Sequence, residues 1–131
     1  MNSEPTLKFD VILSKDAAKY IEKLDMQRKR QVFQVFLGME TNPLSGDIET
    51  IKGTPGYFRR RIGRYRLKFK LVIGTRQTEE PEKTKEIREV HVLDFGPRGD
   101  FRYQGKEPRL SGLLFSFRRG KLRYRNIGYY L

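Results

Sequence analysis

The sequence contains no cysteine and only one histidine among its 131 residues. Without cysteine, the chain can form no disulfide, no thiol nucleophile and no cysteine-based zinc site. A single histidine also excludes a multi-histidine metal centre and a pair of histidines that act as acid and base. These absences predict a protein that works without a bound metal or cofactor.

Long apolar runs are missing as well. No hydrophobic run approaches the roughly 18 residues that span a bilayer, and the first residues lack the apolar centre of a signal peptide. We therefore expect a cytoplasmic protein that does not contact membranes. Hydrophobic residues make up 37% and charged residues 34% of the chain, which suits one packed domain with a tail.

Acidic residues are absent from one long stretch. Residues 50–78 contain nine lysine or arginine residues and no aspartate or glutamate, and the whole chain has a net charge of +12. Such a positive field favours nucleic acid, an acidic protein partner or an anionic membrane surface. We interpret this stretch as a phosphate-binding patch, with a solvated face or a contact with an acidic protein partner as the alternatives.

The spacing of apolar residues separates helices from strands. Ser14 is a good N-cap, and Ala17, Ile21 and Leu24 follow it at helical intervals. A second apolar stripe predicts a helix from about 26 to 40. Alternating residues predict strands at 7–13, 57–62, 65–73 and 87–95, with a further short strand at 48–51, whereas 74–86 is expected to be a solvated loop.

A cationic hairpin is the most distinctive element of the pattern. The strands at 57–62 and 65–73 are expected to pair through a tight turn at Gly63-Arg64. Because side chains alternate between the faces of a sheet, one face should be packed and the other charged. The charged face should carry Arg59, Arg61, Arg66, Lys68 and Lys70.

The C-terminal part of the chain is strongly basic. Residues 101–131 carry eight basic residues and one acidic residue. Residues 113–125 are expected to form a hairpin around Arg119-Gly120. We divide the chain into a domain at 1–103 and a basic C-terminal extension at 104–131.

Three segments carry a resemblance to a known family. They read LSKDAAKYIEKLD at 13–25, NPLSGDIETIKGTPGYFRRRIGRYRLKFKL at 42–71 and VHVLDFGPRGDFRY at 90–103. Their order, and above all the pattern Gly-Tyr-Phe-Arg-x-Arg-Ile-Gly-x-Tyr-Arg-Leu, resembles the RelE/ParE superfamily of toxins. The resemblance covers about residues 7–103. It implies an α+β fold in which two N-terminal helices pack on one face of a small antiparallel sheet, here with an extra C-terminal hairpin.

The resemblance also implies a function. RelE-like proteins are ribosome-dependent endonucleases of messenger RNA, and ParE-like proteins instead poison DNA gyrase. Both are toxins of type II toxin–antitoxin systems, and a cognate antitoxin protein inhibits them. The expected partners are therefore an antitoxin with the ribosome and mRNA, or alternatively an antitoxin with DNA gyrase. A non-toxic relative that only binds nucleic acid is the third possibility.

A metal-independent nuclease of this type uses the ribose 2′-hydroxyl to attack the adjacent phosphate. The reaction needs a proton acceptor, a proton donor and cations near the phosphate. The resemblance assigns catalysis to Arg59, Arg61, Arg66, Arg98 and Tyr103, although Tyr103 comes one residue later than in many relatives. Further nucleic-acid contacts are expected from Arg60, Arg64, Lys68 and Lys70. The general base stays open between Tyr103, His91, Glu49, Asp94 and Asp100.

Overall fold

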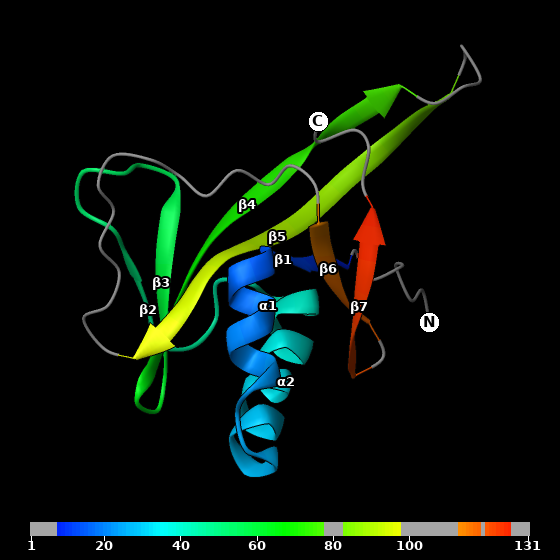
Figure 1. The fold of residues 1–131 in the computed structure, drawn as a ribbon. Helices are drawn as coiled ribbons and strands as arrows, with labels where there is room; N and C mark the ends of the chain where they lie inside the picture. The colour runs from blue at the N-terminus through cyan, green and yellow to red at the C-terminus, as the bar shows by residue number, and fades with distance from the viewer. Residues whose placement is uncertain (1–7, 78–82, 98–112, 119, 127–131) are drawn as a thin grey trace, which may run out of the picture.

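The structure is a computed structural model that describes residues 8–77, 83–97, 113–118 and 120–126. In this part of the chain, two helices accompany one seven-stranded sheet, so the fold is α+β (Figure 1). The elements are β1 (Asp10–Leu13), α1 (Lys15–Glu22), α2 (Met26–Thr41), β2 (Ile48–Thr50), β3 (Tyr57–Ile62), β4 (Tyr65–Gln77), β5 (Thr84–Pro97), β6 (Leu113–Arg118) and β7 (Lys121–Asn126). Their spatial order in the sheet is β2-β3-β4-β5-β1-β6-β7.

Both predicted helices are present, and a side chain caps each of them. The hydroxyl oxygen of Ser14 accepts the backbone N–H of Ala17 at 3.2 Å, and Asp25 accepts the N–H of Arg28 at 2.9 Å. Each cap satisfies a donor that has no partner within its own helix. The backbone N–H of Arg28, followed by its guanidinium, holds the pKa of the Asp25 carboxyl below its usual range.

The sheet is larger than the sequence predicted, and it is not purely antiparallel. β1 pairs parallel with β5 and antiparallel with β6. A parallel pair needs a long crossover connection, and α1 and α2 begin that connection directly after β1. The predicted C-terminal hairpin is confirmed as β6 and β7, which turn at Gly120 with a φ of +76° and extend the same sheet.

The prediction of a solvated loop at 74–86 is wrong at 74–77 and 84–86, which belong to strands, and 78–82 lie outside the described residues. β4 and β5 remain paired from Gly74 opposite Ile87 to Gln77 opposite Thr84. Ladder hydrogen bonds use backbone groups, so pairing continues beyond the last apolar side chains from which the strands were predicted. β4 and β5 therefore extend past the ends of β3 and β1 as a two-stranded ribbon (Figure 1).

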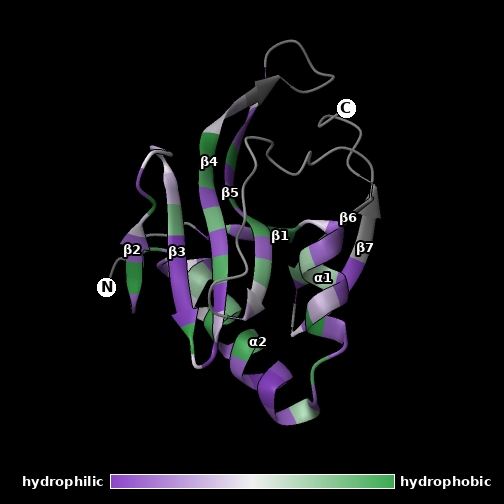
Figure 2. Ribbon diagram, turned by 60° about the vertical axis from the view of Figure 1, so that its left-hand side comes forward, coloured by the Kyte–Doolittle hydropathy of each residue, from purple (hydrophilic) through white to green (hydrophobic). Residues whose placement is uncertain are grey.

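The core contains side chains from both helices and alternate side chains from the strands. Ile21, Phe36, Leu67, Val92 and Phe117 are all at most 2% exposed and belong to this cluster. The alternation is visible in Figure 2 as polar and apolar bands along β4 and β5. Since Phe117 lies on β6, the C-terminal hairpin contributes to the same core as the N-terminal helices.

We predict that Phe117→Ala destabilises the whole protein. The Phe117 ring lies 5.0 Å from the Phe33 ring and 5.3 Å from the Phe36 ring, measured between centroids. Replacing a buried phenylalanine with alanine typically costs about 3–5 kcal/mol. Urea denaturation should show this loss, whereas Lys121→Ala, at an exposed position of the same hairpin, should stay within about 0.5 kcal/mol of wild type. A loss below about 1 kcal/mol for Phe117→Ala would contradict the shared core.

Candidate nucleic-acid interface

Five cationic side chains lie on one face of β3 and β4. Phe58 lies opposite Phe69 on the core side, where their rings stack at 5.4 Å. The alternating residues therefore point to the other face, where Arg59 lies opposite Lys68 and Arg61 opposite Arg66. We call this set the cationic face: Arg59, Arg61, Arg66, Lys68 and Lys70.

Two members of the cationic face are buried rather than projecting into solvent. Arg66 is 7% exposed, and its guanidinium donates to the backbone oxygens of Tyr65 at 3.0 Å and of Gly63 at 3.3 Å. Lys68 is 1% exposed, and its Nζ lies 4.9 Å from the centroid of the Tyr57 ring. Arg66 is thus held in a fixed position, and Lys68 is too deeply placed to contact a ligand directly.

The environment of Lys68 disfavours its charge. Burial lowers the pKa of the Lys68 ammonium below its usual range, and the positive charge of Arg59 adds to this effect. The carboxylate of Asp94, which lies opposite Lys68 on β5, acts in the other direction. Keeping Lys68 charged in this environment therefore lowers the free energy of unfolding.

Carboxylates approach the cationic face from outside the stretch that lacks them. Glu49 on β2 lies opposite Arg59, with Oε1 3.4 Å from its Nη1, and Asp47 lies 3.6 Å from Nε of Arg61. Asp47 is not among the site residues that the sequence predicts. Asp47 and Glu49 alternate shortly before a basic strand. This spacing indicates contacts with Arg59 and Arg61 only once β2 is known to pair with β3.

A pocket lined by arginines lies at one end of the cationic face. It has a volume of about 500 Å³, and the residues that line it are Arg61, Gly63, Arg64, Arg66 and Pro97. No carboxylate is among these lining residues, all of which belong to the described ranges. Guanidinium groups bind phosphate oxygens through paired hydrogen bonds, so this arginine pocket suits a phosphate or a phosphodiester.

Arg60, expected to contact nucleic acid, lies apart from the other cations. It is opposite Leu67, and its guanidinium donates to the backbone oxygen of Ser45. A β-carbon on Gly46, which has a φ of +96°, would overlap that guanidinium. Arg60 therefore stabilises the turn before β2 and is not part of the cationic face.

The candidates for the general base are scattered. His91 is 2% exposed, and its Nε2 lies 3.0 Å from Oε1 of Glu89, opposite Lys70 and away from the arginine pocket. Glu49 pairs with Arg59, and Asp94 lies opposite Lys68. None of these three residues lines the arginine pocket. The positions of Arg98, Tyr103 and Asp100 lie outside the described residues.

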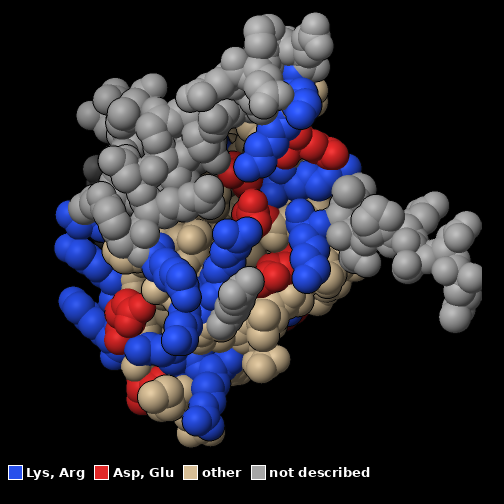
Figure 3. Space-filling view, turned by 90° about the vertical axis from the view of Figure 1, so that its right-hand side faces the viewer, with Lys and Arg blue, Asp and Glu red and all other residues tan. Residues whose placement is uncertain are grey.

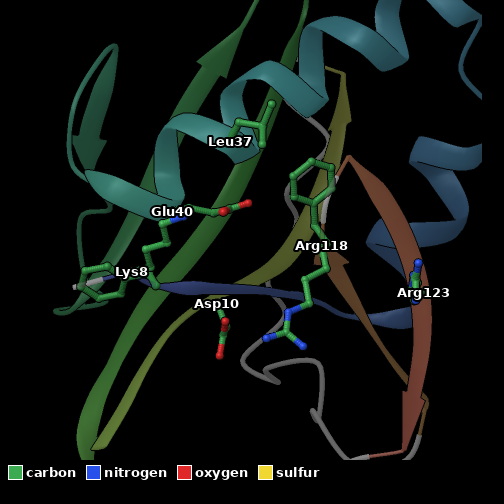
Figure 4. Close-up of a pocket in the computed structure, with 8 residues that line it drawn as sticks. Lys8, Asp10, Leu37, Glu40, Arg118 and Arg123 are labelled. Atoms are coloured by element: carbon green, nitrogen blue, oxygen red, sulfur yellow. The ribbon is translucent and has the colours of Figure 1, made fainter. Parts of the chain in front are cut away.

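A second hollow, of about 670 Å³, lies between the start of β1, the end of α2 and the C-terminal hairpin (Figure 4). Its walls carry charges of both signs, from Lys8, Arg118 and Arg123 and from Asp10 and Glu40. Figure 3 likewise shows acidic side chains interspersed among the more numerous lysines and arginines on one side of the molecule. The arginine pocket differs, since the charged residues among its described lining are all arginines.

The described ranges hold no group of three or more His, Cys, Asp or Glu residues that could bind a metal ion. Neither α1 nor α2 is long and apolar enough to cross a membrane. Comparison with family models, with curated proteins and with solved structures gives no significant match for this chain.

We predict that Lys68 makes stability increase with pH in the alkaline range. Its pKa is lower in the folded than in the unfolded protein, so the unfolded state binds more protons between the two values. The free energy of unfolding should therefore rise as the pH increases towards the usual lysine pKa. Lys68→Met should lose this part of the rise, as measured by urea denaturation at several values between pH 7 and 10.

The matched control is Lys121→Met, because Lys121 is exposed on β7. Its stability profile should run parallel to that of wild type. Parallel profiles for wild type and Lys68→Met would contradict the burial of a charged lysine.

Proposed function

We propose that this protein is a RelE-like toxin that cleaves ribosome-bound messenger RNA, with the arginine pocket as the site of the scissile phosphate. The observation that carries the proposal is the convergence of Arg61, Arg64 and Arg66 on a pocket at the end of β5. Pro97 also lines this pocket, and it directly precedes Arg98, the further arginine that the family resemblance assigns to catalysis.

The finer description of the fold belongs to the same proposal. In a RelE/ParE-like arrangement, the two N-terminal helices pack together on one face of the sheet. The shared core of α1, α2 and the alternate strand side chains supports this arrangement. The opposite face of β3 and β4 then presents the cationic face, as an RNA-binding surface requires.

The proposed step exchanges one phosphorus–oxygen bond for another. The ribose 2′-oxygen bonds to phosphorus, and the bond from phosphorus to the 5′-oxygen breaks, leaving a 2′,3′-cyclic phosphate and a 5′-hydroxyl. Negative charge grows on the phosphate oxygens during this exchange. Arg66, whose two carbonyl contacts fix its guanidinium, is placed to stabilise that charge without reorganisation. Arginine stays protonated, so the proton acceptor must be another group.

A ParE-like gyrase inhibitor without nuclease activity is the second candidate. One observation favours it: within the part of the chain that the structure describes, no histidine or carboxylate lines the arginine pocket. In this case the pocket would bind an anionic group of a partner without any bond being broken. The two candidates differ in whether RNA is cut.

We predict that Arg66→Ala slows single-turnover RNA cleavage on saturated ribosomes by about 10²–10³-fold, because it removes a donor whose contact strengthens in the transition state. RNA affinity should fall much less, since other cations still contact the phosphates. Primer extension after toxin addition to a translation reaction measures both the site and the rate of cleavage.

The matched control is Arg60→Ala, which removes the same charge from a residue outside the cationic face. Correctly folded Arg60→Ala should cleave at a rate within a few-fold of wild type. Intact mRNA on ribosomes with wild-type protein, together with loss of gyrase supercoiling, would replace the nuclease proposal with the gyrase alternative.

A further inference from the structure

The two-stranded ribbon leaves part of β4 at an edge. β3 follows β4 only as far as Lys70, which lies opposite Tyr57, whereas β4 continues to Gln77. Over residues 71–77, the described structure places β5 on one side of β4 and no strand on the other. Backbone N–H and C=O groups on that second side form a row with which another strand can pair.

This edge lacks the protection that the ends of the sheet have. Residues 71–75 read Leu-Val-Ile-Gly-Thr and carry no charge, and Ile73 is 58% exposed. In contrast, β2 has only three residues, and β7 carries the exposed cations Lys121 and Arg123. Short or charged edge strands resist pairing with other chains, and an uncharged apolar edge invites it.

The other side of the ribbon is also protected. On β5, the residues that pair with this part of β4 include Lys85, Glu86 and Arg88. Glu86 and Arg88 form an ion pair at 2.6 Å. Within the described ribbon, the uncharged edge is therefore confined to β4.

We propose that residues 71–75 of β4 are a docking edge for an extended, acidic segment of a partner protein, which adds to the sheet as a strand in line with β3. This docking edge is distinct from the arginine pocket, so the proposal goes beyond RNA cleavage and does not depend on it. Backbone pairing would supply affinity, and the side chains beside the edge would select the sequence of the segment.

The apolar side chains beside the edge define one requirement for the segment. Leu71 packs against the core cluster, and Ile73 follows two positions later on the same face of β4. Apolar residues on the matching face of a docked strand would cover Ile73 and continue the core outward. Alternating apolar and polar residues therefore suit the centre of the segment.

Charge defines the second requirement. A strand docked in line with β3 ends next to Lys70 and Tyr57, where the Lys70 Nζ lies 5.8 Å from the Tyr57 ring centroid. The surrounding stretch, 50–78, has nine cations and no carboxylate, and the chain has a net charge of +12. Carboxylates at the ends of the segment would be attracted, whereas a second copy of this chain would bring two strongly positive molecules together.

Two capped nine-residue peptides test the proposal on the full-length protein. Both have five central residues that alternate valine with threonine, but one has two aspartates at each end and the other has two lysines. The aspartate peptide should slow amide hydrogen exchange at residues 71–75, as measured by NMR, and the protection should weaken as salt increases. The lysine peptide should leave these amides unchanged.

Two variants with the same change in charge locate the binding. Ile73→Glu should weaken binding of the aspartate peptide by about tenfold or more, because it replaces an apolar contact with a charge of the same sign as the peptide. Thr84→Glu, at an exposed position of β5, should change affinity by less than about twofold, since it lies on the other side of the ribbon. Unchanged exchange at β4–β5 amides outside 71–75 would verify that Ile73→Glu still folds.

Three results would overturn the proposal. The first is unaltered exchange at 71–75 with millimolar aspartate peptide, and the second is equal protection by the lysine peptide. The third is protection that appears without peptide and grows with protein concentration, which would assign the edge to a second copy. RNA cleavage by wild type and by Ile73→Glu should be the same, so failure of this proposal is distinguishable from failure of the proposed nuclease function.

Discussion

The register between β3 and β4 is the constraint on which the site depends. Packing of Phe58 against Phe69 fixes it, because shifting either strand by one residue would turn the cations of that strand towards the core. The same register sets Arg59 opposite Lys68 and Arg61 opposite Arg66. Like charges in opposite positions destabilise a sheet, so the packed face must outweigh this repulsion on the cationic face.

The surrounding structure lowers that repulsion unevenly. Glu49 approaches Arg59, Asp94 acts on the charge of Lys68, and the Tyr57 ring lies beside Lys68. At the hairpin end, Arg61 has Asp47 at 3.6 Å, and the described residues that line the pocket include three arginines and no carboxylate. Carboxylates and the Tyr57 ring therefore offset positive charge along the middle of β3 and β4, and three arginines meet at the arginine pocket. Clustered guanidinium groups of this kind suit a site for a phosphate.

Local sequence patterns predicted helices and strands, but they did not reveal the contacts between residues that are far apart in the sequence. Ser14 and the apolar stripe after it placed α1, and alternation placed β3 and the cations opposite its packed face. The parallel pairing of β1 with β5 joins residues about eighty positions apart, so no local pattern could reveal it. The carboxylates near Arg59 and Arg61 depend on β2 pairing with β3. Burial of Arg66 and Lys68 also depends on tertiary packing, and alternation alone had placed them simply on a charged face.

The central claim is that an RNA phosphate binds in the arginine pocket. NMR of the arginine side-chain Nε–H groups tests it most directly, during titration with a short RNA whose nucleotide 5′ to the scissile phosphate is 2′-deoxy and therefore cannot be cut. The account predicts that the resonances of Arg61, Arg64 and Arg66 shift together, and that the resonance of Arg60 changes least. Saturating shifts confined to arginines outside the pocket, such as Arg118 and Arg123, would contradict it.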